Sequence, residues 1–257
     1  MVSKYQHIFP RNYNTYYEPF LGGGSVFFHL MPEHATISDS NRDLINTYRA
    51  MARNPIGLRT LLEEHQEHHC LQHYYDVRDN IPDDATARAA RFLYLNRTCF
   101  NGMYRVNQSG HFNVPIGTRN YFIEDVELFE EYSQILRHAH IRSQDFVETI
   151  RSAAAGDLVF ADPPYAIANN QNSFIKYNEK LFSWKDQVRL LNALVKARDR
   201  GAIIVSTNAL YQELQQKYQD NGFYTQSLNR FSSISGMAHG RGMQEELLIT
   251  SYPINID

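Results

Sequence analysis

A short apolar segment that runs into two prolines is the strongest constraint on how this chain can fold. The segment Leu158–Ala161 (LVFA) carries no polar side chain on either face. Such an uninterrupted apolar run is typical of a strand in a parallel sheet that helices cover on both faces. The motif Asp162–Tyr165 (DPPY) follows it, and its prolines lock φ and remove two amide donors. The pattern predicts a buried parallel strand that ends in a rigid turn.

Other short apolar or β-branched runs indicate further strands, which alternate with helical spacing near both ends of the chain. We expect strands at 15–17, 35–38, 140–142, 158–161, 202–205, 225–231 and 247–252. Helical spacing occurs at 25–31, 184–199 and 210–220, and Asn41 is a good N-cap for a helix that includes Tyr48. Alternating strands and helices predict an α/β fold with a parallel sheet.

The middle of the chain has a different pattern. From Asn54-Pro55 to about residue 138 the apolar spacing is mostly helical. Residues 104–114 differ, because Asn107–Gly110 lies between alternating residues, which predicts a β-hairpin. We therefore expect a discontinuous α/β domain made of residues 1–53 and 140–257. A mostly helical domain of residues 54–139, which carries the hairpin, is inserted in it.

The composition excludes several classes of protein. A hydrophobic share of 43% with 21% charged residues is that of a folded chain, and no run approaches the length of a membrane span. The net charge of −3 argues weakly against a nucleic-acid partner, but arginines gather between Arg78 and Arg119, so that region is locally basic. With two cysteines and no apolar leader segment, we expect a cytoplasmic protein without a membrane partner.

Glycines after the first strand, together with an acid after the second, favour nucleoside binding. The glycines of Glu18-Pro19-Phe20-Leu21-Gly22-Gly23-Gly24 allow a sharp turn and a close approach of the backbone to a ligand. Asp39 stands at the end of the next strand, where a carboxylate can accept hydrogen bonds from both ribose hydroxyls. The alternative is an ordinary tight turn, because many loops contain a glycine run.

The residues of the DPPY turn suit methylation of an adenine amine. The lone pair of that amine is delocalised into the ring, so the amine is a poor nucleophile. Asp162 and the carbonyl of Pro163 can each accept one hydrogen bond from it, which frees the lone pair to attack a methyl sulfonium. Such catalysis depends on positioning and electrostatics rather than on a strong base. Tyr165 would stack on a base that has left the duplex; the alternative is a rigid structural turn.

These motifs, in this order, resemble Dam-type (D12 class) DNA adenine-N6 methyltransferases over nearly the whole chain. The matching segments are Glu18–Phe20 with its glycines, Ser38-Asp39, Leu95–Arg105, Gly110–Pro115, Asp145-Phe146, Asp162–Tyr165 and Ser206–Asn208. The resemblance implies a Rossmann-like methyltransferase sheet with helices on both faces, S-adenosylmethionine as cofactor and double-stranded DNA as partner. It also implies that Asp145 and Phe146 hold the adenine ring of the cofactor, and that residues 54–139 recognise DNA.

Two sets of residues follow from the motifs and the resemblance. The expected catalytic residues are Asp162, Pro163, Pro164 and Tyr165. The expected cofactor-binding residues are Glu18, Pro19, Phe20, Gly22, Gly24, Asp39, Asp145, Phe146 and Asp162. We expect the protein to be bacterial or phage-encoded and to be a monomer or a weak dimer.

The resemblance further implies DNA contacts around the hairpin. Arg105 would read a guanine edge, with a phosphate contact or a solvated face as the alternative, and for Arg97 that alternative is favoured. Phe100 and Met103 are candidates to wedge into the base stack, and Pro115 to contact a base. The expected DNA-binding set is Arg97, Phe100, Asn101, Met103, Arg105, Asn113, Pro115, Arg119 and Arg241.

The recognition site is expected to be GATC-like, because the hairpin is most similar to that of family members that target GATC. Arg119 replaces an aromatic residue of that pattern, which weakens the expectation. Arg241 lies in the stretch 232–243, which suits a clamp on backbone phosphates and a disordered loop equally well.

Alternatives remain within and outside this family. The family opens with an apolar-Trp-Ala-Gly-Gly-Lys type of segment, whereas Lys4 lies only six residues before Pro10 and no glycine precedes it. A shortened segment favours a sequence-specific DNA-binding relative whose catalysis is weak or lost. Related Pro-Pro-Tyr enzymes that methylate cytosine, RNA or glutamine usually have Ser or Asn where this chain has Asp162, which favours adenine. A nicotinamide oxidoreductase is disfavoured, because no third glycine completes G-x-G-x-x-G.

A histidine cluster is the remaining candidate site. His65, His69 and His73 recur at i, i+4 spacing, with His68 and Cys70 between them. Such a set could bind a metal ion. A solvated helix face is the favoured interpretation, because methyl transfer requires no metal, so we expect no metal ligands.

Overall fold

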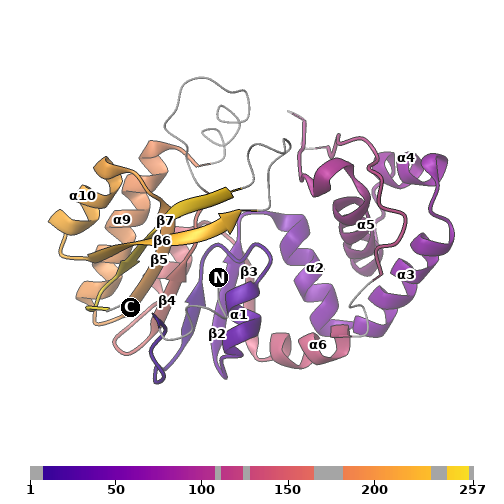
Figure 1. Ribbon diagram of the computed structural model, residues 1–257. Helices are drawn as coiled ribbons and strands as arrows, with labels where there is room; N and C mark the ends of the chain where they lie inside the picture. Colours follow the sequence, from indigo (N-terminus) through magenta and orange to yellow (C-terminus); the bar gives the residue numbers. More distant parts are fainter. Residues whose placement is uncertain (1–7, 108–110, 124–127, 165–181, 233–241, 255–257) are drawn as a thin grey trace. The chain divides into compact units, whose positions relative to one another are not determined.

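A computed structural model describes residues 8–107, 111–123, 128–164, 182–232 and 242–254 (Figure 1). Contacts within the chain separate two units, residues 1–40 with 142–257, and residues 41–141. The first boundary therefore lies at residue 41 rather than at the expected 54. The reason is α2 (Arg42–Arg53), which packs against helices of the second unit.

The first unit is built on a seven-stranded sheet with the order β3-β2-β1-β4-β5-β7-β6. Its strands are β1 (Tyr16–Glu18), β2 (Ala35–Asp39), β3 (Ala139–Ser143), β4 (Leu158–Ala161), β5 (Ile203–Ala209), β6 (Tyr224–Ser232) and β7 (Gly242–Thr250). β1 is parallel to β2 and β4, and β4 is parallel to β5, whereas β7 is antiparallel to β5 and β6. The expected Rossmann-like methyltransferase sheet is confirmed.

Helices cover both faces of this sheet: α1 (Ser25–Leu30), α7 (Phe146–Arg151), α9 (Trp184–Asp199) and α10 (Gln212–Asp220). Successive side chains of a strand point to opposite faces of the sheet. Two neighbouring tyrosines of β1 illustrate this alternation. Tyr16 contacts the ring of Phe27 in α1, whereas Tyr17 belongs to the core shared with α7, α9 and α10. The buried run 158–161 thus lies between two helical layers, as its sequence predicts.

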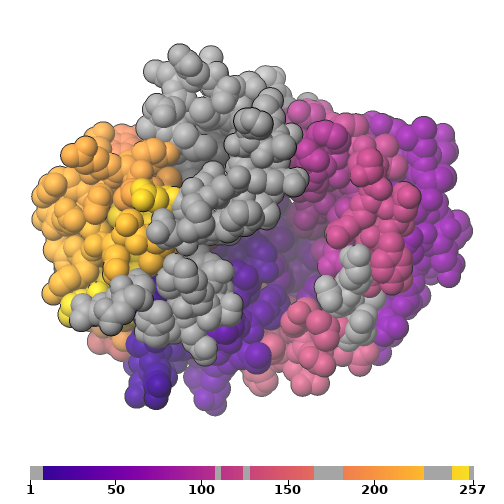
Figure 2. Space-filling model, viewed as in Figure 1, coloured from indigo at the N-terminus to yellow at the C-terminus, as the bar shows by residue number. Residues whose placement is uncertain are grey.

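The second unit is helical, and α5 (Ala85–Thr98) is packed by its neighbours on several sides. The other helices are α2, α3 (Pro55–Glu67), α4 (Leu71–Asp79), the short 3₁₀ helix η2 (Phe100–Gly102) and α6 (Phe129–Arg137). Asn41 caps α2 as expected, because its side-chain oxygen accepts hydrogen bonds from the amides of Asp43 and Leu44. Figure 2 shows side chains of this unit, purple to pink, at its surface.

His65, His69 and His73 are half-buried and pack against Tyr94, so for these three the favoured solvated face is wrong, whereas His68 and Cys70 are exposed. α3 ends at Glu67 and α4 begins at Leu71, which breaks the i, i+4 helical series. The His65 ring stacks on Tyr94 with centroids 4.8 Å apart, and its Nδ1 lies 3.0 Å from Nε2 of His73. Among the described residues, no group of three or more His, Cys, Asp or Glu side chains has an arrangement suited to a metal ion.

Two further observations bear on the composition. Cys70 and Cys99 are both free, one exposed and the other buried. Of the helices in the described ranges, none has the length and apolarity needed to cross a membrane.

Protonation of His65 should destabilise the helical unit. Burial, together with the neighbouring His73 and His68, lowers the pKa of His65 from 6.5 to about 4. The unfolded chain binds this proton below pH 6.5, whereas the folded chain does so only near pH 4. The stability that neutral His65 contributes is therefore present above pH 6.5 and is lost as the pH falls through this window. We expect the free energy of unfolding to fall by up to about 2 kcal/mol between pH 7 and pH 5.

Urea unfolding at the two pH values measures this loss. The variant His65→Phe keeps a ring on Tyr94 and cannot be protonated, so its loss should be smaller than that of the wild type. The matched control is His34→Gln, which replaces an exposed histidine of the other unit and should keep the wild-type loss. An equal loss in His65→Phe would contradict the assignment.

Candidate active site

The site forms where the order of the strands reverses. β2 lies on one side of β1 and β4 on the other, and β1 is parallel to both. Chains that leave the carboxyl ends of two such strands diverge, so a crevice opens between them, and ligands of open α/β folds bind there. The loop after β1 begins at Pro19, and the loop after β4 begins at Asp162.

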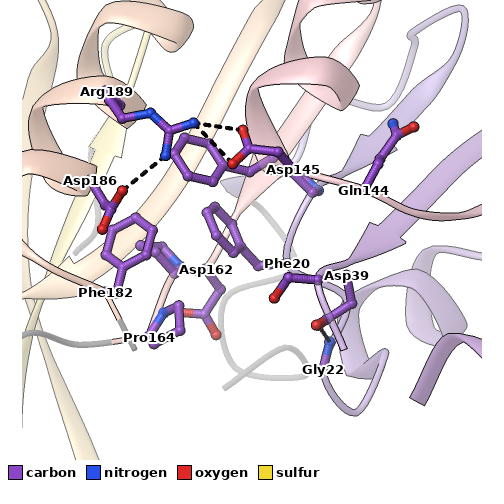
Figure 3. Close-up of a pocket in the computed structure, with 14 residues that line it drawn as sticks. Phe20, Gly22, Asp39, Gln144, Asp145, Asp162, Pro164, Phe182, Asp186 and Arg189 are labelled. Carbon is purple, nitrogen blue, oxygen red and sulfur yellow. Dashed lines mark hydrogen bonds and ion pairs between the residues drawn. The ribbon is translucent and has the colours of Figure 1, made fainter. Parts of the chain in front are cut away.

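A cleft of about 480 Å³ lies at this point, within the range of small-molecule sites (Figure 3). Expected residues that line it are Pro19, Phe20, Gly22, Asp39, Asp145, Phe146, Asp162, Pro163 and Pro164. Residues that line it without having been expected are Ser40, Gln144, Phe182, Asp186 and Arg189. Glu18 and Gly24 are not among the lining residues, and Tyr165 lies outside the described residues.

The glycine turn ties the end of β2 to the loop after β1. The amide of Gly22 donates to Oδ2 of Asp39 at 3.1 Å, and the amide of Leu21 donates to the carbonyl of Ser38 at 2.9 Å. Gly22 and Gly24 have φ of 48° and 66°, a left-handed conformation that glycine adopts without strain. Gly24 is the N-cap of α1.

Three phenylalanine rings from different elements form the apolar wall of the cleft. Phe20 stacks on Phe146 with centroids 5.1 Å apart and an interplanar angle of 29°. Phe182 lies 5.5 Å from Phe20 and 5.6 Å from Phe146, at steeper angles. The rings come from the loop after β1, from the start of α7 and from the segment before α9. Together they offer an apolar surface of the kind that a purine ring packs against.

Asp145 is fixed next to these rings. It is the N-cap of α7, and its Oδ1 accepts a hydrogen bond from the amide of Val147 at 2.9 Å. Arg189 of α9 donates through Nη2 to both oxygens of Asp145, at 3.0 and 2.9 Å. The same guanidinium donates through Nη1 to Asp186 at 2.9 Å and lies 4.8 Å from the centre of the Phe146 ring.

Asp162 is held by the neighbouring strand. The register pairs Ala161 with Ser206, so the following residue of β5, Thr207, comes beside Asp162. The hydroxyl of buried Thr207 donates to Oδ1 of Asp162 at 2.6 Å. This bond orients the carboxylate of Asp162, and its donor belongs to β5, whose central residues are buried.

Glu18 lies in the protein interior, outside the cleft. Its side chain is 2% exposed and accepts a hydrogen bond from the hydroxyl of Tyr16 at 2.8 Å. Burial raises the pKa of Glu18 well above its ordinary value, and the nearby carboxylates of Asp162 and Asp39 raise it further, although hydrogen bonds from Tyr16 and Phe27 oppose this. Glu18 is therefore a buried neighbour of Asp162 and Asp39 and is not among the residues that line the cleft.

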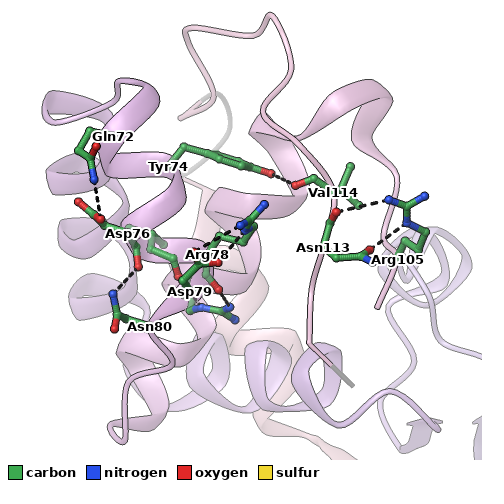
Figure 4. Close-up of polar contacts among 11 residues, drawn as sticks. Gln72, Tyr74, Asp76, Arg78, Asp79, Asn80, Arg105, Asn113 and Val114 are labelled. Atoms are coloured by element: carbon green, nitrogen blue, oxygen red, sulfur yellow. Dashed lines mark hydrogen bonds and ion pairs between the residues drawn. The ribbon is translucent and has the colours of Figure 1, made fainter. Parts of the chain in front are cut away.

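In the helical unit, the two segments that flank the expected hairpin turn run antiparallel. Val106 bridges to Phe112 and Cys99 to Ile116, although neither segment forms a regular strand. Residues 108–110, at the expected turn, lie outside the described residues. Figure 4 shows Tyr74 of α4 donating to the carbonyl of Val114 at 2.9 Å, which fixes the second segment.

Most of the expected DNA-binding side chains are exposed. The exposed ones are Phe100, Asn101, Arg105, Asn113, Pro115 and Arg119. Met103 is half-buried, and Arg105 is held by Asn113, whose Oδ1 accepts from Nε at 2.9 Å. Arg97 donates to the carbonyl of Phe122 at 2.6 Å, a structural contact that neither interpretation of Arg97 anticipated. Arg241 lies outside the described residues.

Comparison with known proteins identifies the family of this chain. A family model described as D12 class N6 adenine-specific DNA methyltransferase matches residues 1–235. The chain belongs to this family. Its resemblance to D12-class enzymes, deduced from the motifs, is confirmed.

Several named relatives of this D12-class chain are similar over most of its length. The type II methyltransferase M1.LlaDCHI of Lactococcus lactis subsp. cremoris is 36% identical over 256 residues, which cover 96% of this chain and 89% of the relative. The DNA adenine methylase of Vibrio cholerae is 33% identical, with 92% and 86% covered. The DNA N-6-adenine-methyltransferase of Escherichia phage P1 is 34% identical over 90% of this chain, which is 31% of the phage protein.

Five residues that line the cleft were missed from the sequence, and three of them, Phe182, Asp186 and Arg189, lie just before or within the beginning of α9. A signal for the helix start was present, because Ser183 and Asp186 form a capping box at the start of α9. Arg189 follows one turn later. Nothing in a single sequence, however, places Arg189 of α9 against Asp145.

Replacing Glu18 by glutamine should change how stability depends on pH. An acid whose pKa is raised on folding stays protonated in the folded chain while the unfolded chain releases the proton. Its contribution to stability is therefore lost as the pH rises above 4.5 towards the folded-state pKa. Glutamine has no such proton, so Glu18→Gln should gain stability relative to the wild type as the pH rises from 5 to 8.

Thermal or urea unfolding of both proteins across this range checks the sign. Glu33→Gln, a change at an exposed carboxylate beyond α1, serves as control and should follow the wild type. A stability difference between Glu18→Gln and wild type that does not change with pH would show that Glu18 is ionised in the folded protein.

Proposed function

We propose that this chain transfers a methyl group from S-adenosylmethionine to the N6 amine of adenine in double-stranded DNA. The observation that carries the proposal is the position of Asp162, which lines the cleft directly after β4 and is oriented by Thr207. Membership of an adenine-specific family supports the base and the atom. Relatives named type II methyltransferases support a role in restriction–modification.

The residues that line the cleft fit S-adenosylmethionine. The rings of Phe20, Phe146 and Phe182 would pack on its adenine, Asp145 would accept from its exocyclic amine, and Asp39 would accept from the ribose hydroxyls. Four aspartates and one arginine are among the described lining residues, and this excess of negative charge favours a ligand that carries a sulfonium. When bound, the cofactor supplies a methyl group that is electrophilic because it is attached to that sulfonium.

The residues of the turn after β4 would act on the target base. The carboxylate of Asp162 and the carbonyl of Pro163 would accept the two hydrogens of the adenine amine, which localises its lone pair on nitrogen. The hydroxyl of Thr207 holds Oδ1 of Asp162, so this acceptor does not have to reorganise during the reaction. Asp162 thereby serves as a hydrogen-bond acceptor rather than as a general base.

The helical unit is proposed to recognise DNA. Its exposed Phe100 would wedge into the base stack, and Arg105 would donate to a guanine edge in a GATC-like site. Asn101 has φ of 54°, a left-handed conformation that asparagine adopts more readily than most residues other than glycine. The target adenine would leave the duplex, which costs a few kcal/mol.

Substitution of Asp162 tests the catalytic part of the proposal. Asp162→Ala removes the acceptor of the amine hydrogen, so the rate of methyl transfer should fall by about 10²–10³-fold. Transfer of labelled methyl from S-adenosylmethionine to DNA measures the rate, and a gel-shift titration should give DNA affinity close to that of the wild type. Asp199→Ala, at the far end of α9, is the matched control and should retain full turnover. Turnover at the wild-type rate in Asp162→Ala would exclude the proposed role.

Substitution of Arg105 tests base recognition. Arg105→Ala should reduce methylation of the preferred site and reduce discrimination at one base-pair position by about 1–3 kcal/mol. Methylation rates on duplexes that differ by single base pairs measure this. Arg59→Ala, which removes a partly exposed arginine of α3 that pairs with Glu63, should leave the preferences unchanged. Uniform weakening on every duplex would reassign Arg105 to a phosphate contact.

A further inference from the structure

We propose that Arg189 is a positioning residue of the cleft, which holds Asp145 so that it selects an amino group over an oxo group on the cofactor purine. The inference rests on the proposed function, because it requires the cleft to bind the adenine of S-adenosylmethionine. Figure 3 shows Arg189 between Asp145 and Asp186, with hydrogen bonds to both.

The hydrogen bonds of Asp145 leave one position for a ligand. Each carboxylate oxygen can accept about two hydrogen bonds. Within the described residues, Oδ1 accepts from the amide of Val147 and from Nη2 of Arg189, so it is saturated. Oδ2 accepts from Nη2 of Arg189 at 2.9 Å, and no other described residue donates to it, which leaves one of its lone pairs for a ligand. A purine amine that packs by the neighbouring rings would find its acceptor there.

Arg189 is itself fixed by contacts on other sides. Its Nη1 donates to Oδ1 of Asp186, and the other oxygen of Asp186 accepts from the amide and hydroxyl of Ser183 at 3.0 and 2.7 Å. The guanidinium also lies over the Phe146 ring. Asp145 is therefore held from α9 as well as by its own helix, α7.

Partial exposure argues against a purely stabilising ion pair. The side chains of Arg189 and Asp145 are 41% and 44% exposed, and pairs of such exposure contribute little to stability. The same contact restricts the rotation of a carboxylate in the cleft wall, which affects a ligand directly. The structure thus assigns Arg189 to ligand positioning.

A fixed acceptor discriminates between purines. Adenine presents an N–H donor at position 6, whereas hypoxanthine presents an oxygen that has only lone pairs. The lone pair of Asp145 Oδ2 would bind the former and repel the latter. Without Arg189 the carboxylate could turn away, so affinity for the amino form would fall and discrimination would weaken.

Calorimetry with S-adenosylhomocysteine and S-inosylhomocysteine tests this role. Arg189→Ala should weaken binding of the adenosyl compound by about 10-fold and change binding of the inosyl compound by less than about twofold. The KM for S-adenosylmethionine should rise by a similar factor while kcat changes little. Arg189→Lys, which keeps a cation able to reach Asp145, should recover part of the discrimination.

Arg151→Ala is the matched control, because Arg151 is paired with Glu148 on α7 and does not line the cleft. It should bind both compounds as the wild type does. Unchanged binding in Arg189→Ala, or equal weakening of both compounds, would overturn the positioning role. If the wild type bound neither compound, the proposed function itself would fail, and these results are distinguishable.

Discussion

Backbone hydrogen bonds between β1 and β4 join residues that the entire helical unit separates in the sequence. Tyr16 pairs with Leu158 and Tyr17 with Val159 in parallel register. Buried Asp157 secures the start of this pairing, because its Oδ1 accepts from the amide of Thr15 at 3.0 Å and its Oδ2 from the amide of Ala154 at 2.8 Å. With the amino ends locked together, the carboxyl ends also lie side by side. The loops after β1 and after β4, which carry Phe20, Gly22 and Asp162, depend on this one pairing.

The register between β4 and β5 likewise determines the hydrogen bond between Thr207 and Asp162. A shift of one residue would turn every side chain of the strand to the other face. The observed pairing of Ala161 with Ser206 brings Thr207 to Asp162, and the hydroxyl of Ser206 bonds back to the carbonyl of Ala161 at 2.7 Å. The hydrogen bond from Ser206 holds this register, so the orientation of Asp162 follows from how β4 and β5 pair.

Local sequence predicted much of the fold and the centre of the site. The buried run 158–161, the cap at Asn41 and the glycine turn act through neighbouring residues, and each is found where it was expected. The position of β7 between β5 and β6 was not predicted, because strand order depends on pairing between distant segments. The placement of α2 in the helical unit was missed for the same reason. The Asn54-Pro55 break marks the end of a helix but does not show which side that helix packs on.

The histidines and Arg189 show a different limit of sequence reasoning. Spacing at i, i+4 predicts a common face only while one helix continues, and here α3 ends before His69. What decides the environment of His65 is Tyr94, which lies in another helix. Arg189 likewise matters through Asp145, which is distant in the sequence. Both properties come from contacts between elements, which periodicity does not encode.

Three aspartates of the cleft share a common arrangement, which links the fold to the proposed chemistry. Asp39 is held by the amide of Gly22, Asp145 by the guanidinium of Arg189 and Asp162 by the hydroxyl of Thr207. Each donor comes from a different element than the carboxylate that it holds. A carboxylate that is already oriented loses less conformational freedom when a ligand binds and reorganises less as charge develops. The proposed methylation of an amine needs acceptors in fixed places rather than a strong base. The elements that hold these carboxylates in place therefore contribute directly to the proposed catalysis.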